Sequence, residues 1–317
     1  GFFLIPVVGF AWTVGLAAGL NLILAGSASL LGEKVDRRIA ALAVMGMVLL
    51  CVFPPKVPWE LLRFAALSRT VLKGERIFDR VGRSSTVLLL RRNGSYYVTN
   101  NGLPEAGVIP ADDSSGDLTN RWLGAFPVLA RPDTESLLVI GLGGGLIVED
   151  TPRSIKEVDV IELEPEVVEA NRFLSERRFS DPLSDPRIRI IENDARGALM
   201  LTEKRYDAIV SQPSHPWTAG ASHLYTREFF DLVSDRLTPG GVFIQWIGLR
   251  FVDEELLRSL VATLLDVYPN VRVYSPPPYR AVLFVASDLP LPVERTAAEG
   301  IAQSPETFAR MGIETPE

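Results

Sequence analysis

The sequence predicts an α/β fold with a doubly wound, mostly parallel sheet. Three observations predict it: β-rich runs alternate with helical stretches from Ser136 onward, the runs are rich in apolar residues, and a glycine run follows the first of them. Such alternation is typical of parallel sheets, because each connection crosses one face of the sheet as a helix. The predicted strands are residues 136–141, 158–164, 187–194, 206–212, 242–247, 271–275 and 280–287. The predicted helices are residues 165–179, 226–237 and 253–268, and the last two strands are expected to add an antiparallel edge.

Residues 1–53 predict two transmembrane helices. Residues 12–31 are 20 residues without a charge, about the length that a helix needs to cross a hydrocarbon core of roughly 30 Å. A second apolar run, residues 39–53, ends at Pro54 and Pro55, which cannot continue a helix. Small residues recur along both runs and let membrane helices approach closely. Two buried helices of a soluble core are the alternative, and a signal peptide is disfavoured because no basic region precedes the first run.

The chain opens without Met, inside the apolar stretch GFFLIPVVG. We therefore expect the two helices to be the remnant of a larger membrane region. Basic residues lie on both sides of the second helix, so the positive-inside rule does not fix the orientation.

The soluble part divides into four segments. Residues 54–75 read as a linker, and residues 76–110 as a small β-rich module. Within the module, Asn93-Gly94 separates two β-rich runs, which is a strong hairpin signal. Residues 111–288 form the predicted α/β domain, and residues 289–317 read as a polar tail.

Composition excludes several classes of function. Residues 1–59 contain four of the 32 basic and two of the 39 acidic side chains, which leaves 28 basic and 37 acidic ones in residues 60–317. A domain with this excess of acidic side chains repels the phosphate backbone of a nucleic acid. No nucleic-acid partner is therefore expected. Cys51 is the single cysteine and there are two histidines, so no Cys/His zinc site and no metal is expected.

Three predicted strand ends carry residues suited to a nucleoside. Gly141, Gly143 and Gly145 follow the first strand and allow a tight turn with close approach of a ligand to the backbone. Glu162, 21 positions after Gly141, is placed to accept both hydroxyls of a ribose. The alternation of the strand leaves Glu164 as the alternative.

The third strand end is Asn193-Asp194-Ala195, where Asp194 is able to accept a hydrogen bond from the exocyclic amine of adenine and Ala195 lines the pocket. A helix N-cap is the alternative role for Asp194. No phosphate-cradling lysine motif is present, so a nucleoside without phosphates is favoured. S-adenosylmethionine or a relative is the economical ligand.

The motifs VIGLGGGL, VIELEPEVVEANR, DPRIRIIENDAR and YDAIVSQPSHPWTAGASHLYTREFF, in this order after the hairpin, resemble spermidine synthases, the polyamine aminopropyltransferases. More narrowly, they resemble the bacterial branch in which this domain follows major-facilitator-like membrane helices. The resemblance implies a Rossmann-like sheet of the class I methyltransferase type. It also implies that the glycine loop, Glu162 and Asp194 hold the methylthioadenosine part of decarboxylated S-adenosylmethionine.

The amine-transfer half departs from the family pattern. Gly144 stands where the G-G-G-D-G-G motif has its aspartate, and Gln212 stands where the D-S-S-D-P motif has its catalytic acid. An amide cannot act as a base, so putrescine is doubtful as the acceptor. Glu105, at the position of the glutamine of L-D-G-x-x-Q, and Glu164 are the candidate replacements.

Two further residues of the same loop are candidate substrate contacts. His215 is either a substitute base or a loop histidine bonded to backbone. Trp217 is either a packing lid or an aromatic face for a substrate cation.

Three functions follow from these patterns. The first is a membrane-anchored, spermidine synthase-like transferase that moves an aminopropyl group to an amine other than putrescine. The second is an S-adenosylmethionine-dependent methyltransferase. The third is a catalytically degenerate binding or structural subunit. In each case we expect the bacterial inner membrane with the α/β domain on the cytoplasmic side, and a homodimer or a subunit of a membrane assembly.

Overall fold

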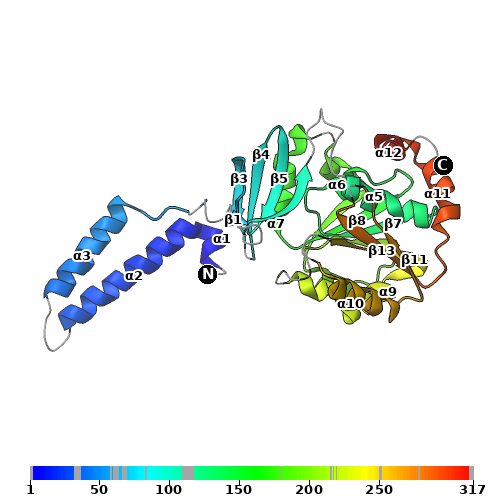
Figure 1. Ribbon diagram of the computed structural model, residues 1–317. Helices are drawn as coiled ribbons and strands as arrows, with labels where there is room; N and C mark the ends of the chain where they lie inside the picture. The colour runs from blue at the N-terminus through cyan, green and yellow to red at the C-terminus, as the bar shows by residue number, and fades with distance from the viewer. Residues whose placement is uncertain are drawn as a thin grey trace.

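The computed structural model describes residues 3–31, 37–57, 59, 64–65, 70–82, 84–108, 118–178, 180–214, 216, 218, 220–249, 252–277 and 279–313. The α/β body is built on a seven-stranded sheet (Figure 1). Its strands are β7 (Ser136–Ile140), β8 (Glu157–Glu162), β9 (Ile188–Glu192), β10 (Tyr206–Ser211), β11 (Leu237–Gly248), β12 (Asn270–Tyr274) and β13 (Ala281–Ser287).

The strand order is β12-β13-β11-β10-β7-β8-β9. Strands β11, β10, β7, β8 and β9 run parallel, whereas β13 is antiparallel to both β11 and β12. The predicted parallel sheet with an antiparallel edge is therefore confirmed. The chain builds outward from β7 through β8 to β9 and then returns to the other side of β7 as β10, so the connections diverge between β7 and β10.

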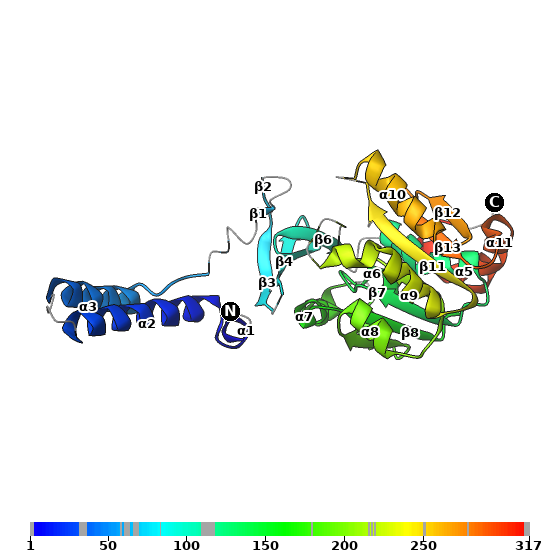
Figure 2. The ribbon, with the colours of Figure 1, turned by 90° about the horizontal axis from the view of Figure 1, so that it is seen from below.

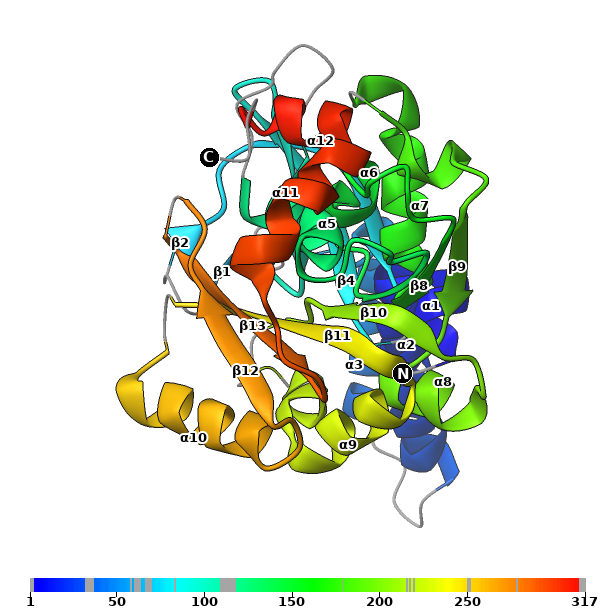
Figure 3. The same cartoon turned by 90° about the vertical axis from the view of Figure 1, so that its right-hand side faces the viewer.

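Helices cover both faces of the sheet because its central strands are apolar on both sides (Figure 3). Leu137 and Val139 of β7 point into one core, and Leu138 and Ile140 point into the other. On the first face lie α5 (Leu118–Ala130), α6 (Leu146–Glu149) and α7 (Pro165–Phe173). On the second lie α8 (Ala195–Leu201), α9 (Arg227–Asp235) and α10 (Glu254–Leu265).

The small β module is a four-stranded antiparallel sheet of β3 (Glu75–Val81), β4 (Thr86–Arg92), β5 (Ser95–Asn100) and β6 (Leu103–Val108). Asn93 and Gly94 adopt positive φ angles of 51° and 83° between β4 and β5, as a tight hairpin turn requires. The module shares its core with the α/β body through buried apolar residues that include Phe78, Leu89 and Val108. Within the predicted linker, β1 (Phe64–Ala65) pairs with β2 (Thr70–Val71).

The carboxy-terminal segment differs from the predicted polar tail over 289–317. It forms α11 (Val293–Gln303) and α12 (Pro305–Arg310), and Val293 and Phe308 enter the main core. Buried Asp150 attaches α12 to the α/β body through ion pairs. Its carboxylate lies 3.1 Å from Arg310 of α12 and 3.1 Å from Arg121 of α5. Val293, Ala297 and Ile301 have the spacing of a helix face, but the small and polar residues between them kept this signal weak in the sequence.

The amino-terminal segment contains α1 (Leu4–Val8), α2 (Phe10–Leu31) and α3 (Arg37–Val52). Helices α2 and α3 lie side by side in Figures 1 and 2, and Gly46 of α3 faces Leu22 of α2. The 22 residues of α2 span about 33 Å and none of them is buried. Among the described residues, α2 alone is long and apolar enough to cross a membrane.

The prediction of two transmembrane helices is therefore corrected to one candidate. Helix α3 has 16 residues and begins at Arg37 and Arg38, so it reaches only about 24 Å. That length falls short of a hydrocarbon core of roughly 30 Å.

Gly300 provides a test of whether α11 belongs to the core. A methyl group there would lie 2.2 Å from the carbonyl oxygen of Val128 in α5. We predict that Gly300→Ala lowers the free energy of unfolding by about 1–3 kcal/mol, although alanine favours a helix over glycine. Urea unfolding of the purified chain measures this, with Glu299→Ala on the exposed face of the same helix as the control. Equal stability of the two variants would show that α11 is only loosely attached.

Candidate functional site

A cavity of about 220 Å³ lies at the carboxyl ends of β7, β8, β9 and β10, where the connections of the sheet diverge. We call it the outer cavity. Ligands of doubly wound sheets bind at this place, because the loops on either side separate there. Every nucleoside candidate from the sequence except Gly145 lines it: Gly141, Gly143, Glu162, Asp194 and Ala195.

The glycine loop follows β7 and lies in the left-handed backbone region that glycine adopts without strain. Gly141, Gly143 and Gly145 have φ angles of 92°, 52° and 77°. A methyl group on Gly141 would lie 2.7 Å from the carbonyl oxygen of Gln212, which follows β10. The glycines therefore bring two strand ends together and leave backbone exposed to the cavity.

Glu162 holds this loop in place from the end of β8. Its carboxylate accepts hydrogen bonds from the backbone N–H of Leu142 at 2.9 Å and of Glu164 at 3.0 Å. Burial raises the pKa of Glu162 above its usual value, although these backbone bonds act in the opposite direction. The side chain thus has a structural role that the sequence did not show.

Asp194 has the capping role that was the alternative to a ligand contact. Its Oδ2 accepts a hydrogen bond of 2.7 Å from the backbone N–H of Gly197, which makes it the N-cap of α8. The carboxylate is exposed and still faces the outer cavity. Ala195, the next residue, is buried at the cavity wall.

Glu164 also lines the outer cavity, and it is almost completely buried. It lies beside Glu166: burial raises the pKa of the Glu166 carboxyl, and the neighbouring Glu164 raises it further. With Glu105, Glu162 and Asp194, this makes four carboxyl groups around one cavity. The described residues that line it contain no Lys, Arg or His.

A second, smaller cavity of about 50 Å³ adjoins the outer one, and we call it the inner cavity. Its walls are residues of β6, α5, the glycine loop and β11. Its described lining residues are Glu105, Ala106, Asn120, Leu142, Gly143, Gly144, Leu146, Gln212, Pro213, Ser214 and Trp246. The two cavities share Glu105, Gly143 and the segment from Gln212 to Ser214.

Strand β6 explains why position 144 is glycine. A methyl group on Gly144 would lie 2.8 Å from the carbonyl oxygen of Gly107 and 3.1 Å from the Cβ atom of Ala106. An aspartate at this position has no room. The same strand supplies a carboxyl group at Glu105 instead.

Gln212 and Glu105 meet at the junction of the two cavities. Gln212 donates from Nε2 to Oδ1 of Asn120 at 2.5 Å, and Ser214 donates from Oγ to Oε1 of Glu105 at 2.6 Å. Burial raises the pKa of Glu105 to about 7; the Ser214 hydrogen bond lowers it and the charge of Glu162 raises it.

The sequence identified Glu105 and Gln212 but not their partners. Ser214 lies in the SQPSHPW motif, but no local signal showed that it bonds to Glu105, which is 109 positions away. His215 and Trp217, the other candidate substrate contacts, lie outside the described residues.

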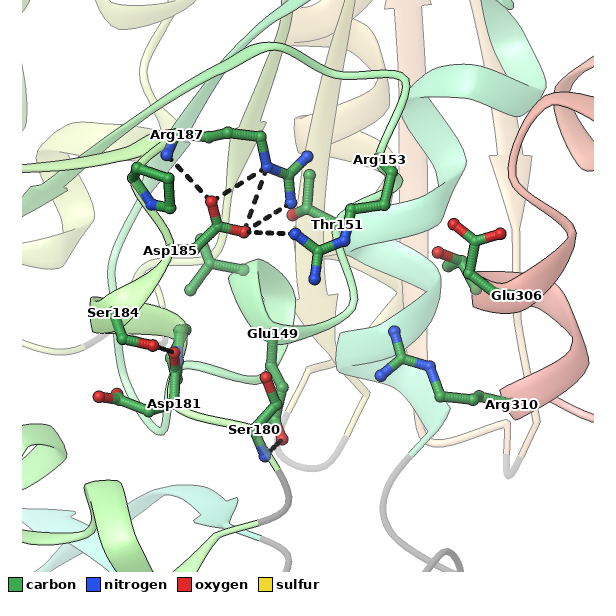
Figure 4. Close-up of a pocket in the computed structure, with 14 residues that line it drawn as sticks. Glu149, Thr151, Arg153, Ser180, Asp181, Ser184, Asp185, Arg187, Glu306 and Arg310 are labelled. Atoms are coloured by element: carbon green, nitrogen blue, oxygen red, sulfur yellow. Dashed lines mark hydrogen bonds and ion pairs between the residues drawn. The ribbon is translucent and has the colours of Figure 1, made fainter.

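A third and larger cavity, of about 280 Å³, lies between α6, α12 and the segment before β9 (Figure 4). Several of its charged side chains have partners: Asp185 accepts from both Arg187 and Arg153 in Figure 4. Arg310 pairs with buried Asp150, which lies outside the lining. Arg187 also donates to two backbone carbonyl groups. We therefore assign this cavity a structural role in attaching α12.

Glu162→Ala tests the structural role of the Glu162 carboxylate. We predict a loss of about 1–3 kcal/mol in the free energy of unfolding, because two backbone N–H groups lose their acceptor inside the protein. Urea unfolding measures the loss. Glu192→Ala is the matched control, since Glu192 lies opposite Glu162 in the register of β9 and is exposed. A loss no larger than that of the control would contradict the assignment.

The α/β body is similar in sequence to known proteins. A family model described as the spermine/spermidine synthase domain matches residues 117–279. Polyamine aminopropyltransferase 2 of Pseudomonas aeruginosa is 28% identical over 172 residues, which cover 53% of this chain and 49% of the relative. A polyamine aminopropyltransferase of Serratia proteamaculans is 23% identical over 170 residues, covering 53% of this chain and 59% of the relative. The chain thus spans about half the length of the curated relatives it matches.

The fold is shared with solved structures of the same class. A crystal structure titled spermidine synthase from Thermotoga maritima has a TM-score of 0.58 and 20% identity, covering 70% of this chain and 75% of that one. This confirms the predicted Rossmann-like, methyltransferase-type sheet with an antiparallel β module before it. Because the family model covers 163 of 317 residues, the chain belongs to the spermine and spermidine synthase family, the polyamine aminopropyltransferases.

Proposed function

We propose that the outer cavity binds decarboxylated S-adenosylmethionine and that the protein transfers its aminopropyl group to an amine. The observation that carries this proposal is the charge of the cavity. Four carboxyl groups line it, and its described lining residues include no basic side chain. Such a site favours a ligand that is cationic at both its sulfonium and its amine.

The nucleoside is expected to use the three strand ends. Its ribose hydroxyls are donors for Glu162, whose carboxylate oxygens have lone pairs beyond those used by the backbone. Its adenine amine is a donor for Asp194, with Ala195 and the exposed glycine backbone against the rings. These assignments agree with those that the family resemblance implies.

Methyl transfer from intact S-adenosylmethionine is the second candidate, because the same sulfonium serves both reactions. The intact ligand adds a carboxylate, which needs a basic or N–H partner to leave water. The charge of the outer cavity therefore favours the decarboxylated ligand.

Titration calorimetry with the detergent-solubilised chain tests the donor. We predict that decarboxylated S-adenosylmethionine binds at least ~10-fold more tightly than the intact form, which corresponds to about 1.4 kcal/mol. Methylthioadenosine is expected to bind to the same site. Preference for the intact form would shift the assignment to a methyltransferase, and binding of none of the three by folded protein would leave a non-catalytic subunit.

Asp194→Asn is the variant for this experiment, because asparagine caps a helix as well as aspartate does. We expect unchanged unfolding but weaker binding of methylthioadenosine, since the substitution replaces one acceptor oxygen by an NH₂ donor. Asp253→Asn is its matched control: Asp253 caps α10 through a 2.8 Å bond from the Leu256 N–H and lines neither cavity.

We also propose that α2 anchors the chain in a membrane, as in the branch of the family fused to membrane helices, with the α/β body on the cytoplasmic side. Support comes from its length and from side chains that no part of the described chain buries. Leu16, Leu20, Ile23 and Leu24 are all more than half exposed. Lipid would remove this apolar surface from water.

Leu20→Arg tests the anchor. An arginine near the centre of a transmembrane helix costs about 2.5–3.5 kcal/mol on insertion scales. We predict that the wild-type chain stays in the membrane pellet after alkaline carbonate extraction and that a larger share of Leu20→Arg is released. Met200→Arg, on the exposed face of α8, is the control and should behave as wild type. Release of the wild-type chain itself would rule out a transmembrane anchor.

A further inference from the structure

The two cavities meet at one carboxyl group. Glu105 lines both of them, whereas Glu162, Glu164 and Asp194 line the outer cavity only. A displacement at a sulfonium-bound carbon needs the nucleophile on the side opposite the sulfur. With the donor nucleoside in the outer cavity, the inner cavity offers that opposite side.

Glu105 is held in position by a short chain of hydrogen bonds. Ser214 donates from its hydroxyl to Glu105, and Tyr225 donates from its hydroxyl to the Ser214 carbonyl oxygen at 3.1 Å. The bond from Ser214 engages Oε1 of Glu105. Among the described residues no side chain donates to its other oxygen, Oε2, which is therefore the one offered to an amine.

The other polar groups of the inner cavity cannot take up a proton at neutral pH. Asn120 and Gln212 are amides that bond to each other, and Ser214 is a hydroxyl. Glu105 is the one carboxyl among the described lining residues of this cavity. Its raised pKa of about 7 suits a group that exchanges protons near neutral pH.

We propose that Glu105 binds the acceptor amine and takes its proton, and that the acceptor is a compact primary amine with a single positive charge. This inference rests on the proposed aminopropyl transfer. It places the catalytic carboxyl on β6, because Glu105 stands where the L-D-G-x-x-Q motif has its glutamine. Conversely, Gln212 stands where the D-S-S-D-P motif has its catalytic acid.

The acceptor ammonium gives one proton to the Glu105 carboxylate and becomes a neutral amine. Its lone pair forms the new C–N bond at the aminopropyl carbon, and the electron pair of the breaking C–S bond goes to sulfur. The products are methylthioadenosine, the aminopropylated acceptor as an ammonium, and a protonated Glu105 that returns its proton to water.

The walls of the inner cavity define the acceptor. Leu142, Leu146 and Ala106 supply apolar contacts, and the cavity of about 50 Å³ admits only a short chain. A second ammonium in it would have no carboxylate partner among the described lining residues, and an unpaired buried charge is costly. A diamine is therefore disfavoured relative to a monoamine of the same length.

Glu105→Gln tests the role of the carboxyl, with release of methylthioadenosine from decarboxylated S-adenosylmethionine as the assay. We expect turnover with propylamine at saturating donor to fall by about 10²–10⁴-fold, as for loss of a general base, whereas donor affinity falls much less because Glu162, Glu164 and Asp194 still line the outer cavity. The wild-type rate should rise with pH through about 7, because Glu105 acts when ionised. Glu166→Gln is the matched control, since Glu166 also has a raised pKa but lines neither cavity.

Ser214→Ala provides a second test, the pH dependence of the rate, which would not change if Glu105 had only a structural role. The Ser214 hydrogen bond lowers the pKa of Glu105, so its removal should shift the rising limb of the pH profile to higher pH. The same profile without a shift would contradict the assignment. Unchanged turnover in Glu105→Gln would overturn the role of Glu105 as the base. So would a loss of donor affinity as large as the loss of turnover, because Glu105 would then anchor the amine of the donor.

Paired acceptors test the substrate class. We expect kcat/KM for propylamine to exceed that for 1,3-diaminopropane by at least ~10-fold, and the reverse order would refute the monoamine assignment. Different outcomes would disprove the aminopropyl transfer and the role of Glu105. A wild-type chain that neither binds the donor nor releases methylthioadenosine with any amine disproves the transfer itself, whereas an active wild type with an equally active Glu105→Gln disproves only the inference about Glu105.

Discussion

The close approach of strand β6 to the glycine loop is the constraint on which the site depends. The backbone of Gly107 and the side chain of Ala106 fill the space beside Gly144, so a side chain larger than hydrogen has no room there. This contact joins the small β module to the α/β body, closes the inner cavity on one side, and carries Glu105 to the place where the two cavities meet. Without it the outer cavity would be an open crevice at the end of a sheet.

The charge of the site follows from the same arrangement. Parallel strands end at one edge, so acids that follow β8 and β9 gather there, and β6 adds one more from outside the sheet. Two of these acids also support the structure around them: Glu162 holds the glycine loop and Asp194 caps α8. Glu105 is itself fixed by Ser214. A cationic ligand would relieve the repulsion among them, so binding and local stability are coupled.

The sequence predicted the fold well because its signals are local. Alternating strands and helices, the Asn93-Gly94 turn and the glycine loop each depend on a few neighbouring residues. The errors concern interactions over long distances in the chain. The contact of Glu105 with Ser214 joins positions 109 apart, and the burial of α11 against α5 depends on Gly300 meeting Val128. The bounds of α3 agree with the predicted run 39–53, but a helix of 16 residues is too short to count as a second transmembrane helix.

The packing of α11 and α12 also has a consequence for the order of folding. Val293 and Phe308 share one core with Phe78 and Leu89, more than 200 positions earlier in the chain. During synthesis this core stays incomplete until residues 293–310 have left the ribosome, long after α2 has emerged. Apolar faces of the β module and of α5 are exposed to water in that interval. High contact order of this kind slows folding and makes the nascent chain dependent on protection from aggregation.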